Sequence, residues 1–323
     1  MRFVDLFSGG GFGAAGAVQA GGVPVLSADT WRIAVDTYKA NFPQSIAKCC
    51  DLTSVSPSDF GIDKSGVDLL LASPECTSHS LARGARPPDE RSRETALVVP
   101  HWVEALSPQW IVLENVARLA NWEGHTGLMR SLCRLGYQLE QHILNAADFG
   151  APQSRKRLFV VGKRGDQPPQ LALEPYLLAR SKSANDVIQW DRWRMSPLYK
   201  PGRAKATLER AGRAIAALGR GKPFIIVYYG SDGAGGWQRT DVPLRTITTL
   251  DRFAVVRWID DVPFMRMLQP QELAVAMGAP NHLLPVGTRR DKVKLCGNGV
   301  CAPVTEALFR AIIAQTSVSA WAA

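Results

Sequence analysis

The first 165 residues alternate short apolar runs with longer amphipathic stretches, and no other feature of the chain restricts the fold as strongly. The apolar runs predict strands at residues 2–7, 23–28, 45–49, 67–72, 110–113, 137–144 and 158–161. The stretches between them predict helices at residues 12–20, 30–41, 91–106 and 126–135. Such alternation is typical of an α/β fold, here a doubly wound, mostly parallel sheet with helices on both faces.

After residue 165 this rhythm stops, and the chain regains globular character only after Pro243. A Gln-Pro-Pro stretch at 167–169 marks the boundary, and a basic helix at 205–218 and an apolar strand at 224–229 follow it. A glycine-rich stretch covers 230–236, and a final helix is expected at 303–314. We therefore expect a first domain at 1–165, a smaller domain at 166–242, and a segment at 243–323 that returns to the first domain.

The positive charge of the chain is concentrated in one segment. Residues 151–222 hold 16 lysines and arginines against 5 aspartates and glutamates, a net charge of +11 within a chain of +9. The remaining residues therefore sum to −2. A localised basic segment favours a polyanionic partner, although a solvated basic surface is the alternative when charge is considered alone.

Several classes of protein are disfavoured by composition. No run of about 18 apolar residues is present, so we expect no membrane-spanning helix. The chain opens with a strand-like run, so we expect no secretory leader. Its cysteines form no C-x-x-C pair, which disfavours a structural zinc site or a disulfide framework and favours free thiols in a reducing cytoplasm. These cysteines are Cys49, Cys50, Cys76, Cys133, Cys296 and Cys301.

A glycine-rich turn follows the first predicted strand, in the sequence Phe7-Ser8-Gly9-Gly10-Gly11. Glycines between a strand and a helix let the backbone pass close to a ligand, although a plain tight turn has the same composition. Asp29 ends the second strand, where a carboxylate can bind ribose hydroxyls, and Trp31 is near enough to offer a stacking face. Asp51 follows the third strand, where it could bond an adenine amino group. These residues together predict a nucleoside-binding site.

A cysteine follows the fourth predicted strand, in the sequence Ser73-Pro74-Glu75-Cys76. Ligands bind at the carboxyl edge of such a sheet, and a thiolate there can add to an electron-poor carbon. An inert buried cysteine is the alternative, but the polar stretch at 77–93 disfavours burial. That stretch would suit a lid that contacts phosphates, because it carries Arg83, Arg86, Arg91 and Arg93.

Two further groups of polar residues belong to the same edge. Glu114 ends the fifth strand, where its carboxyl group could approach Cys76 and protonate a ring nitrogen, or else cap the next helix. Gln153, Arg155 and Arg157 precede the last strand of the first domain. Alternate residues of an extended chain share a face, so the two guanidinium groups could hold a base oxygen or a carboxylate.

In this order and spacing, the motifs resemble those of the DNA cytosine-C5 methyltransferases. The resemblance covers roughly residues 1–165 and 243–316. It is carried by Phe7-Ser8-Gly9-x-Gly11, Pro74-x-Cys76, Glu114-Asn115-Val116, Gln153-x-Arg155-x-Arg157 and Gly297-Asn298-Gly299-Val300.

The resemblance implies a Rossmann-like fold that binds S-adenosylmethionine, with a target-recognition domain at about 166–242. It implies that Cys76 attacks C6 of a cytosine flipped out of double-stranded DNA, that Glu114 bonds the base, and that Arg155 and Arg157 support it. The expected cofactor site, to which we also assign Trp31 and Pro74, comprises Phe7, Gly9, Gly11, Asp29, Trp31, Asp51, Pro74 and Asn298.

Some positions depart from the family pattern. Glu75 and Thr77 flank the nucleophile where the family usually has proline and glutamine. A carboxylate beside a thiolate would raise the pKa of the thiol unless it points away or is paired. Thr30 stands where the family has an aromatic residue, and Gly299 where serine is common. We interpret these changes as variation within the family that leaves the activity in place.

Three other functions are compatible with parts of the pattern. An RNA methyltransferase of the same family would use the same chemistry on tRNA. A non-catalytic DNA-binding relative would explain the unusual flanks of Cys76. An amino-methyltransferase would need an aromatic residue in the Ser73–Cys76 slot, which has none.

The expected partners are DNA and, for a restriction–modification enzyme, a cognate restriction endonuclease. The chain is expected to act as a monomer. Side chains that are candidates for reading bases in the major groove are Trp190, Arg192, Trp193, Arg194 and Tyr229.

Overall fold

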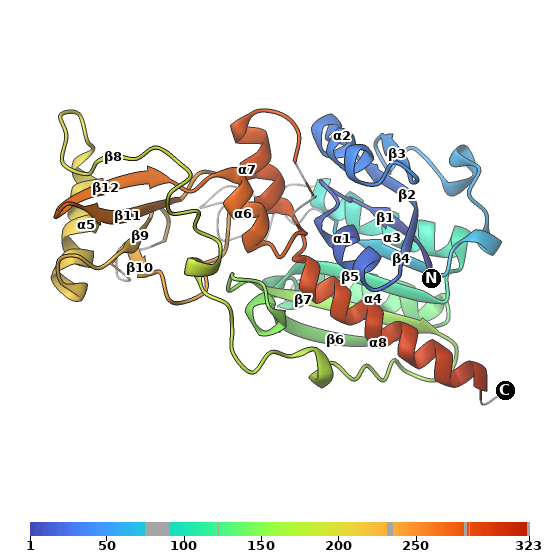
Figure 1. Ribbon diagram of the computed structural model, residues 1–323. Helices are drawn as coiled ribbons and strands as arrows, with labels where there is room; N and C mark the ends of the chain where they lie inside the picture. The colour runs from blue at the N-terminus through green and yellow to red at the C-terminus, as the bar shows by residue number, and fades with distance from the viewer. Residues whose placement is uncertain (75–90, 122, 231–234, 281–282, 284, 322–323) are drawn as a thin grey trace.

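The computed structural model describes residues 1–74, 91–121, 123–230, 235–280, 283 and 285–321. Its larger part is a seven-stranded sheet with the strand order β3-β2-β1-β4-β5-β7-β6 (Figure 1). Neighbouring strands from β3 to β5 are parallel, whereas β7 is antiparallel to both β5 and β6. The predicted α/β fold with a mostly parallel sheet is confirmed. The strands are β1 (Arg2–Leu6), β2 (Val23–Asp29), β3 (Ile46–Cys49), β4 (Leu69–Ala72), β5 (Trp110–Val116), β6 (Tyr137–Asn145) and β7 (Lys156–Arg164).

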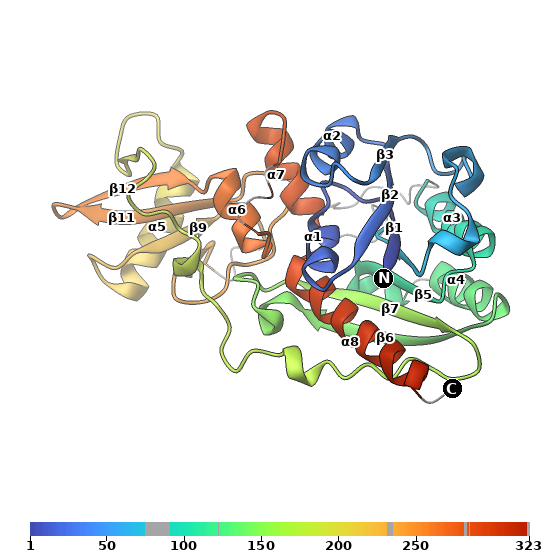
Figure 2. The ribbon, with the colours of Figure 1, turned by 45° about the vertical axis from the view of Figure 1, so that its right-hand side comes forward.

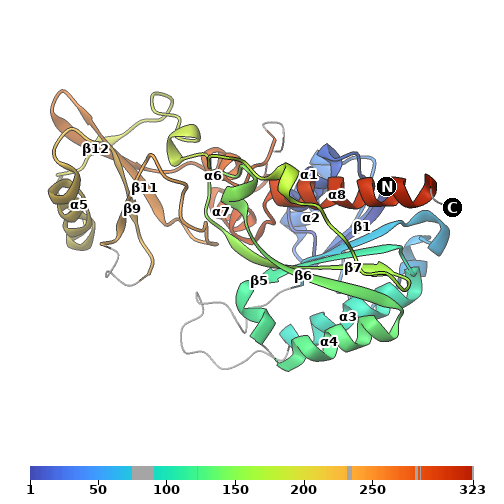
Figure 3. The same cartoon turned by 90° about the horizontal axis from the view of Figure 1, so that it is seen from below.

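Helices cover both faces of this sheet, as the side-chain alternation of the strands requires. Phe3 and Leu69 point into one apolar core with α1, α2 and α8, while Val4 and Leu70 point into a second core with α3 and α4. Figure 3 shows the two layers on either side of the strands. No helix in these described ranges is long and apolar enough to cross a membrane. The helices are α1 (Phe12–Gln19), α2 (Arg32–Asn41), α3 (Arg91–Leu106), α4 (Glu123–Arg134) and α8 (Ala302–Trp321).

The strand order reverses between β1 and β4, because β2 and β3 extend the sheet on one side and β5 on the other. At such a switch point the loops after the strands separate and leave a crevice at the carboxyl edge. Close packing of α8 on α1 completes this domain. A side chain at Gly16 of α1 would collide with the backbone carbonyl of Ala302 at the start of α8.

A second, five-stranded antiparallel sheet lies at the other end of the molecule (Figure 2). Helix α5 (Lys205–Leu218) packs on one face, where Ala211 and Ala214 meet Phe224 and Ile226. The other face, which includes Ile225, joins the large core of the first domain. In sheet order the strands are β10 (Trp237–Arg239), β9 (Phe224–Val227), β11 (Phe253–Ile259), β12 (Val262–Met267) and β8 (Ser196–Pro197).

The second sheet extends past the boundary drawn at residue 242 from the sequence. Strand β11 pairs with β9 on one side and with β12 on the other, so the sheet continues to Met267. The apolar run of β11 has the same composition whichever sheet it joins, which is why composition alone placed it elsewhere. The chain then returns through α6 (Pro270–Ala276) and α7 (Arg289–Asn298), which lie between the two sheets in Figures 1 and 2.

Candidate active site

The glycine-rich turn after β1 has a backbone that ordinary residues rarely adopt. Gly9 and Gly11 have φ angles of 52° and 79°, and Phe7 has a φ of 56°. A Cβ at Gly11 would lie 2.6 Å from the ring of Phe42, so only glycine fits there. A Cβ at Gly9 would have no neighbour within 4 Å, which leaves open space beside the turn. The turn therefore exposes its backbone on one side, as a ligand cradle requires.

Asp29 joins this turn to the start of α2. One carboxylate oxygen, Oδ2, accepts a hydrogen bond from the Gly9 amide at 2.8 Å, and Oδ1 accepts one from the Trp31 amide at 2.8 Å. Burial raises the pKa of Asp29, while these two amides and the charge of Lys294 oppose the increase. Asp29 is held in a fixed position at the carboxyl end of β2 with further lone pairs on both oxygens.

Trp31 and Asp51 lie on either side of this carboxylate. Trp31 precedes α2 and is half-buried, and the ammonium group of Lys294 lies 4.2 Å from the centroid of its ring. Asp51 is exposed at the end of β3, and its Oδ1 accepts hydrogen bonds from the amide and hydroxyl of Thr53 at 3.0 and 2.7 Å. The Cys50 amide donates to the Asp29 carbonyl at 3.1 Å, which keeps the ends of β2 and β3 together.

The C-terminal motif lies beside the same turn. Asn298 is the last residue of α7 and is exposed. Gly299 follows it and packs so closely on Phe12 of α1 that a Cβ would lie 3.0 Å from that ring. The structure thus brings the glycine turn, Asp29, Trp31, Asp51 and Asn298 to one edge of the first sheet.

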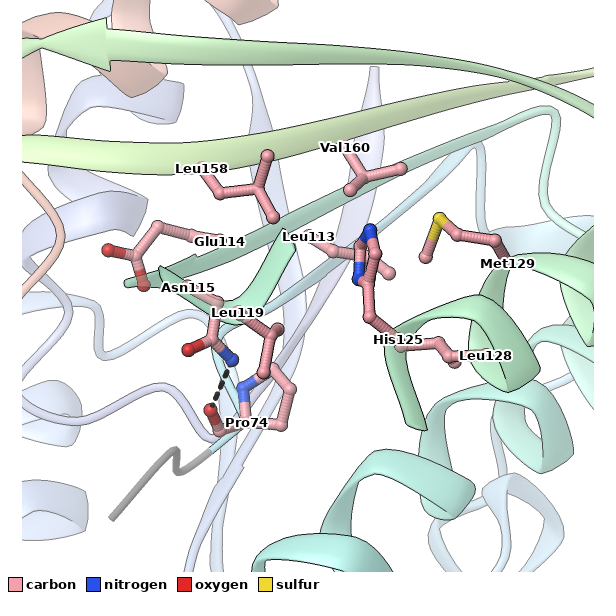
Figure 4. Close-up of a pocket in the computed structure, with 10 residues that line it drawn as sticks. All are labelled: Pro74, Leu113, Glu114, Asn115, Leu119, His125, Leu128, Met129, Leu158 and Val160. Atoms are coloured by element: carbon pink, nitrogen blue, oxygen red, sulfur yellow. Dashed lines mark hydrogen bonds between the residues drawn. The ribbon is translucent and has the colours of Figure 1, made fainter. Parts of the chain in front are cut away.

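The end of β4 is tied to both neighbouring strands. The Ser73 hydroxyl donates to the Phe7 carbonyl at 3.0 Å, and the side-chain amide of Asn115 donates to the Pro74 carbonyl at 3.1 Å. Pro74 is buried at this point (Figure 4). The predicted nucleophile Cys76, and Arg83 and Arg86 of the predicted lid, lie outside the residues that the structure describes.

Glu114 lies at the end of β5, next to Asn115, and is 7% exposed. Its Oε1 is 3.1 Å from Nε of Arg157, which comes from the adjacent strand β7. Burial raises the pKa of Glu114, and the charges of Arg157 and Arg155 oppose this effect. The structure places Glu114 beside the Arg155–Arg157 motif, and the raised pKa favours a carboxyl group that can donate a proton.

Arg155 is more deeply buried than we expected of a side chain that supports the target base. It is 4% exposed, and its two Nη atoms donate to the carbonyls of Ile247 and Gly297 at 3.1 and 2.9 Å. Burial, with a smaller contribution from Arg157, lowers the pKa of Arg155 to about 10. Gln153 is fully buried, and its Oε1 accepts from the Ile247 amide at 2.7 Å. Both side chains thus link the first domain to Ile247, between β10 and β11, and Arg155 also reaches Gly297 near the end of α7.

Sequence reasoning gave no role to three residues at this edge. Asn115 was part of a motif, but its bond to Pro74 spans 41 positions of the sequence. His125 is buried, and its Nε2 lies 3.0 Å from Oε1 of Gln141. Lys294 had no local signal, because only the tertiary fold brings α7 over Trp31.

A small cavity behind the edge has Glu114 and Asn115 on the Pro74 side and the His125 ring on the far side (Figure 4). It is lined by Pro74, Leu113, Glu114, Asn115, Leu119, His125, Leu128, Met129, Leu158 and Val160.

Comparison with known proteins agrees with this arrangement. The profile of the family described as "C-5 cytosine-specific DNA methylase" matches residues 1–314. The type II methyltransferase M.HgiDI of Herpetosiphon aurantiacus is 29% identical over 290 residues, which cover 88% of this chain and 91% of the relative.

Two solved structures share the fold over almost the whole chain. A Spodoptera frugiperda DNMT2 variant superposes with a TM-score of 0.72 at 17% identity, covering 97% of this chain and 99% of its own. A putative DNA modification methyltransferase encoded within an Escherichia coli prophage gives a TM-score of 0.69 at 18% identity, with the same coverage.

Proposed function

The chain belongs to the C-5 cytosine-specific DNA methylase family. We propose that it methylates cytosine at C5 in a site at the carboxyl edge of the first sheet, with Cys76 as the nucleophile and Glu114 as the acid. The protein is a DNA cytosine-C5 methyltransferase, as the family match and its type II methyltransferase relative indicate. The proposal concerns the residues that perform the reaction, the methyl donor and the DNA contacts.

The observation that carries the proposal is the setting of Glu114. The carboxyl group is buried beside Arg157, and its pKa is raised by that burial. A protonated carboxyl group can donate to N3 of cytosine, which withdraws electrons from C6. Arg157 orients the carboxyl group and limits the increase in its pKa, so that the proton can also be released.

Cys76 is proposed to add to that C6 atom as a thiolate. It follows Pro74 by two residues, and Pro74 is bonded to Asn115 next to Glu114. Formation of the S–C6 bond makes C5 a nucleophilic enamine carbon that can take up a methyl group. Loss of the C5 proton to a base then re-forms the C5–C6 double bond and expels the Cys76 thiolate. The cytosine must leave the duplex for this attack, at a cost of a few kcal/mol that protein contacts offset.

The residues around the glycine turn fit S-adenosylmethionine as the methyl donor. The open space beside Gly9 and the fixed Asp29 carboxylate suit a nucleoside whose ribose hydroxyls donate to Asp29. Phe7, Gly11, Asp51, Pro74 and Asn298 are proposed to line the rest of the site. When bound, this cofactor supplies an electrophilic methyl group on a sulfonium centre.

Double-stranded DNA is the proposed partner of the second sheet and the basic segment before it. That segment holds the excess positive charge of the chain, which suits contacts with phosphates. We propose residues 166–267 as the target-recognition part, extended from 242 because β11 and β12 belong to the same sheet. Action as a monomer, alongside a cognate restriction endonuclease in the cytoplasm, completes the proposal.

Bisulfite sequencing of DNA from a host that expresses the chain tests this function directly. We expect methylated cytosines in one short sequence context for the wild type and none for Cys76→Ser. Unmethylated DNA with the wild type, together with methyl transfer from labelled S-adenosylmethionine into tRNA, would instead support the RNA-modifying alternative.

A further inference from the structure

We propose that Lys294 is a positioning residue of the cofactor site. Its ammonium group packs on the ring of Trp31 and places a positive charge near Asp29. This inference rests on the proposed binding of S-adenosylmethionine at the glycine turn. In this proposal Trp31 has a supporting role. Its ring holds Lys294, and the charge of Lys294 keeps the Asp29 carboxylate ionised when it binds the ribose.

The contact between Lys294 and Trp31 joins two distant parts of the chain. Lys294 belongs to α7, near the end of the sequence, whereas Trp31 precedes α2 in the first domain. The ammonium group lies 4.2 Å from the ring centroid, well within the range of about 6 Å for a cation–π interaction. A stacked base needs that same space over the ring, so this face of Trp31 is closed to adenine while the ammonium is present.

Trp31 is in turn bonded to the proposed ribose acceptor. Its backbone amide donates to Oδ1 of Asp29 at 2.8 Å, while the Gly9 amide donates to Oδ2 at the same distance. Lys294, Trp31, Asp29 and Gly9 therefore form a continuous chain of contacts from α7 to the glycine turn. A change at Lys294 is transmitted to the carboxylate through its charge and through the position of Trp31.

The charges around Asp29 show why a cation is needed there. Burial raises the pKa of Asp29, the amides of Trp31 and Gly9 lower it, and the charge of Lys294 lowers it further. The neighbouring carboxyl group is Asp5 of β1, whose own pKa is raised by burial and by Asp29. Cys50 after β3 adds no negative charge, because burial raises the pKa of its thiol. A protonated Asp29 would accept hydrogen bonds from ribose hydroxyls less well, so Lys294 keeps the acceptor in its useful form.

The backbone of α7 does not depend on Lys294 for its position. Val293 and Leu295 on either side are buried, whereas Lys294 is exposed. The Val286 amide also donates to the hydroxyl of Thr37 in α2 at 3.1 Å. Replacing Lys294 therefore removes the charge and leaves the helix in place, which makes the variant informative.

The test is a double-mutant cycle on the affinity for S-adenosylmethionine, measured by calorimetry on Lys294→Met, Trp31→Ala and the combined variant. We expect each single change to weaken binding about threefold to fivefold, the upper part of the range for an exposed cation–π contact. Because both changes remove one contact, the combined variant should lose at most about twofold more than the weaker-binding single variant. Lys294→Arg should bind within about twofold of the wild type.

Two matched measurements separate this role from a structural one. Lys292→Met removes a charge from the same helix and should leave the affinity within about twofold of the wild type. As the pH falls, binding should weaken at a higher pH for Lys294→Met than for the wild type, because Asp29 without its cation protonates at a higher pH. The kcat of Lys294→Met at saturating cofactor and DNA should stay within about twofold of the wild type.

Unchanged or tighter binding by Lys294→Met would overturn the inference, and so would multiplicative losses in the combined variant, since these indicate that Trp31 contacts adenine independently. A wild type that binds no S-adenosylmethionine would instead contradict the proposed function. The two failures are therefore distinguishable.

Discussion

The two sheets of this protein use their side chains in different ways. In the first sheet, parallel strands end at one edge, and residues at or just after the carboxyl ends of β1, β2, β4 and β5 form the candidate site. In the second sheet, short antiparallel strands come from residues 196 to 267, and most of their polar bonds support the fold. The parallel topology therefore brings functional side chains from short local motifs to one edge. The antiparallel pairing of distant segments instead forms a supporting sheet.

The junction between the sheets is made of buried polar bonds. Arg266 of β12 and Glu272 of α6 form a bidentate ion pair with distances of 2.7 Å and side chains that are 4% and 0% exposed. Glu272 also accepts from the backbone amides of Gln189 and Gln269 at 2.7 Å each. These bonds tie β12 of the second sheet to α6, which lies between the two sheets, so the two regions must be tested both separately and together.

The largest effect is expected at Cys76, in the first domain. Cys76→Ser should reduce methyl transfer by at least about a thousandfold, because a serine hydroxyl is far less ionised and less nucleophilic than a cysteine thiol. Affinity for S-adenosylmethionine should remain within about twofold of the wild type, since the thiol is proposed to contact the base. Transfer of labelled methyl groups and calorimetry give the two values; a collapse of cofactor affinity would contradict the separation of the two subsites.

Glu114→Gln should lower kcat by about a hundredfold to a thousandfold, because the amide keeps the shape but cannot deliver a proton. The raised pKa of Glu114 has a directional consequence. The acid form is present below that pKa, so the wild-type rate should fall as the pH rises through it, and this decline should be missing in the variant. A pH–rate profile of both proteins checks this, and an unchanged basic limb in Glu114→Gln would assign that limb to another group.

At the junction, Arg266→Met should destabilise the protein by about 3–5 kcal/mol, because it leaves the Glu272 carboxylate buried without its partner. The combined change Arg266→Met with Glu272→Leu should recover part of this loss. Denaturant unfolding measures both. The exposed pair Arg239–Asp241, 60% and 50% exposed, is the control: Asp241→Asn should cost less than about 1 kcal/mol. Equal losses in the free energy of unfolding at the two pairs would show that burial of the Arg266–Glu272 pair does not increase its contribution to stability.

The smallest effect separates two glycines of the same turn. Gly11→Ala should destabilise the fold by about 1–3 kcal/mol, since its φ of 79° is unfavourable and its Cβ would meet Phe42. Gly9→Ala has open space and should cost about 1 kcal/mol or less, while it weakens cofactor binding. Thermal unfolding with and without S-adenosylmethionine distinguishes the two, and the reverse ranking would contradict the assignment of Gly9 to the open side.

The same difference between the sheets explains what the sequence could predict. All seven strands and the four early helices of the first sheet were found from the sequence, because short apolar runs alternate with longer helical stretches; β1, β4 and β5 are almost wholly buried. In the second sheet only α5 and β9 were found. Strands β11 and β12 acquire their place from pairing across the chain, and their local pattern carries no information about their partner.

The candidate site divides in the same way. The motifs singled out Glu114 and Arg157 separately, each beside a predicted strand, and the structure brings the two side chains together. The motifs did not predict that Arg155 donates hydrogen bonds to the carbonyls of Ile247 and Gly297, or that the ammonium group of Lys294 lies over the ring of Trp31. These contacts join positions that are 92 to 263 residues apart. Separation along the sequence, more than residue type, therefore limits which contacts of the site can be predicted from the sequence.

In the proposed reaction the Cys76 thiolate attacks cytosine while the buried Glu114 protonates the base, both at one edge of the first sheet. This reaction is tested most directly with duplex DNA in which 5-fluorocytosine replaces cytosine, incubated with the protein and S-adenosylmethionine. Fluorine at C5 cannot leave as a proton, so the enzyme should stay bound through the S–C6 bond. The account predicts a denaturation-resistant adduct with the wild type and none with Cys76→Ser. No adduct with the wild type, or an adduct that survives in Cys76→Ser, would contradict it.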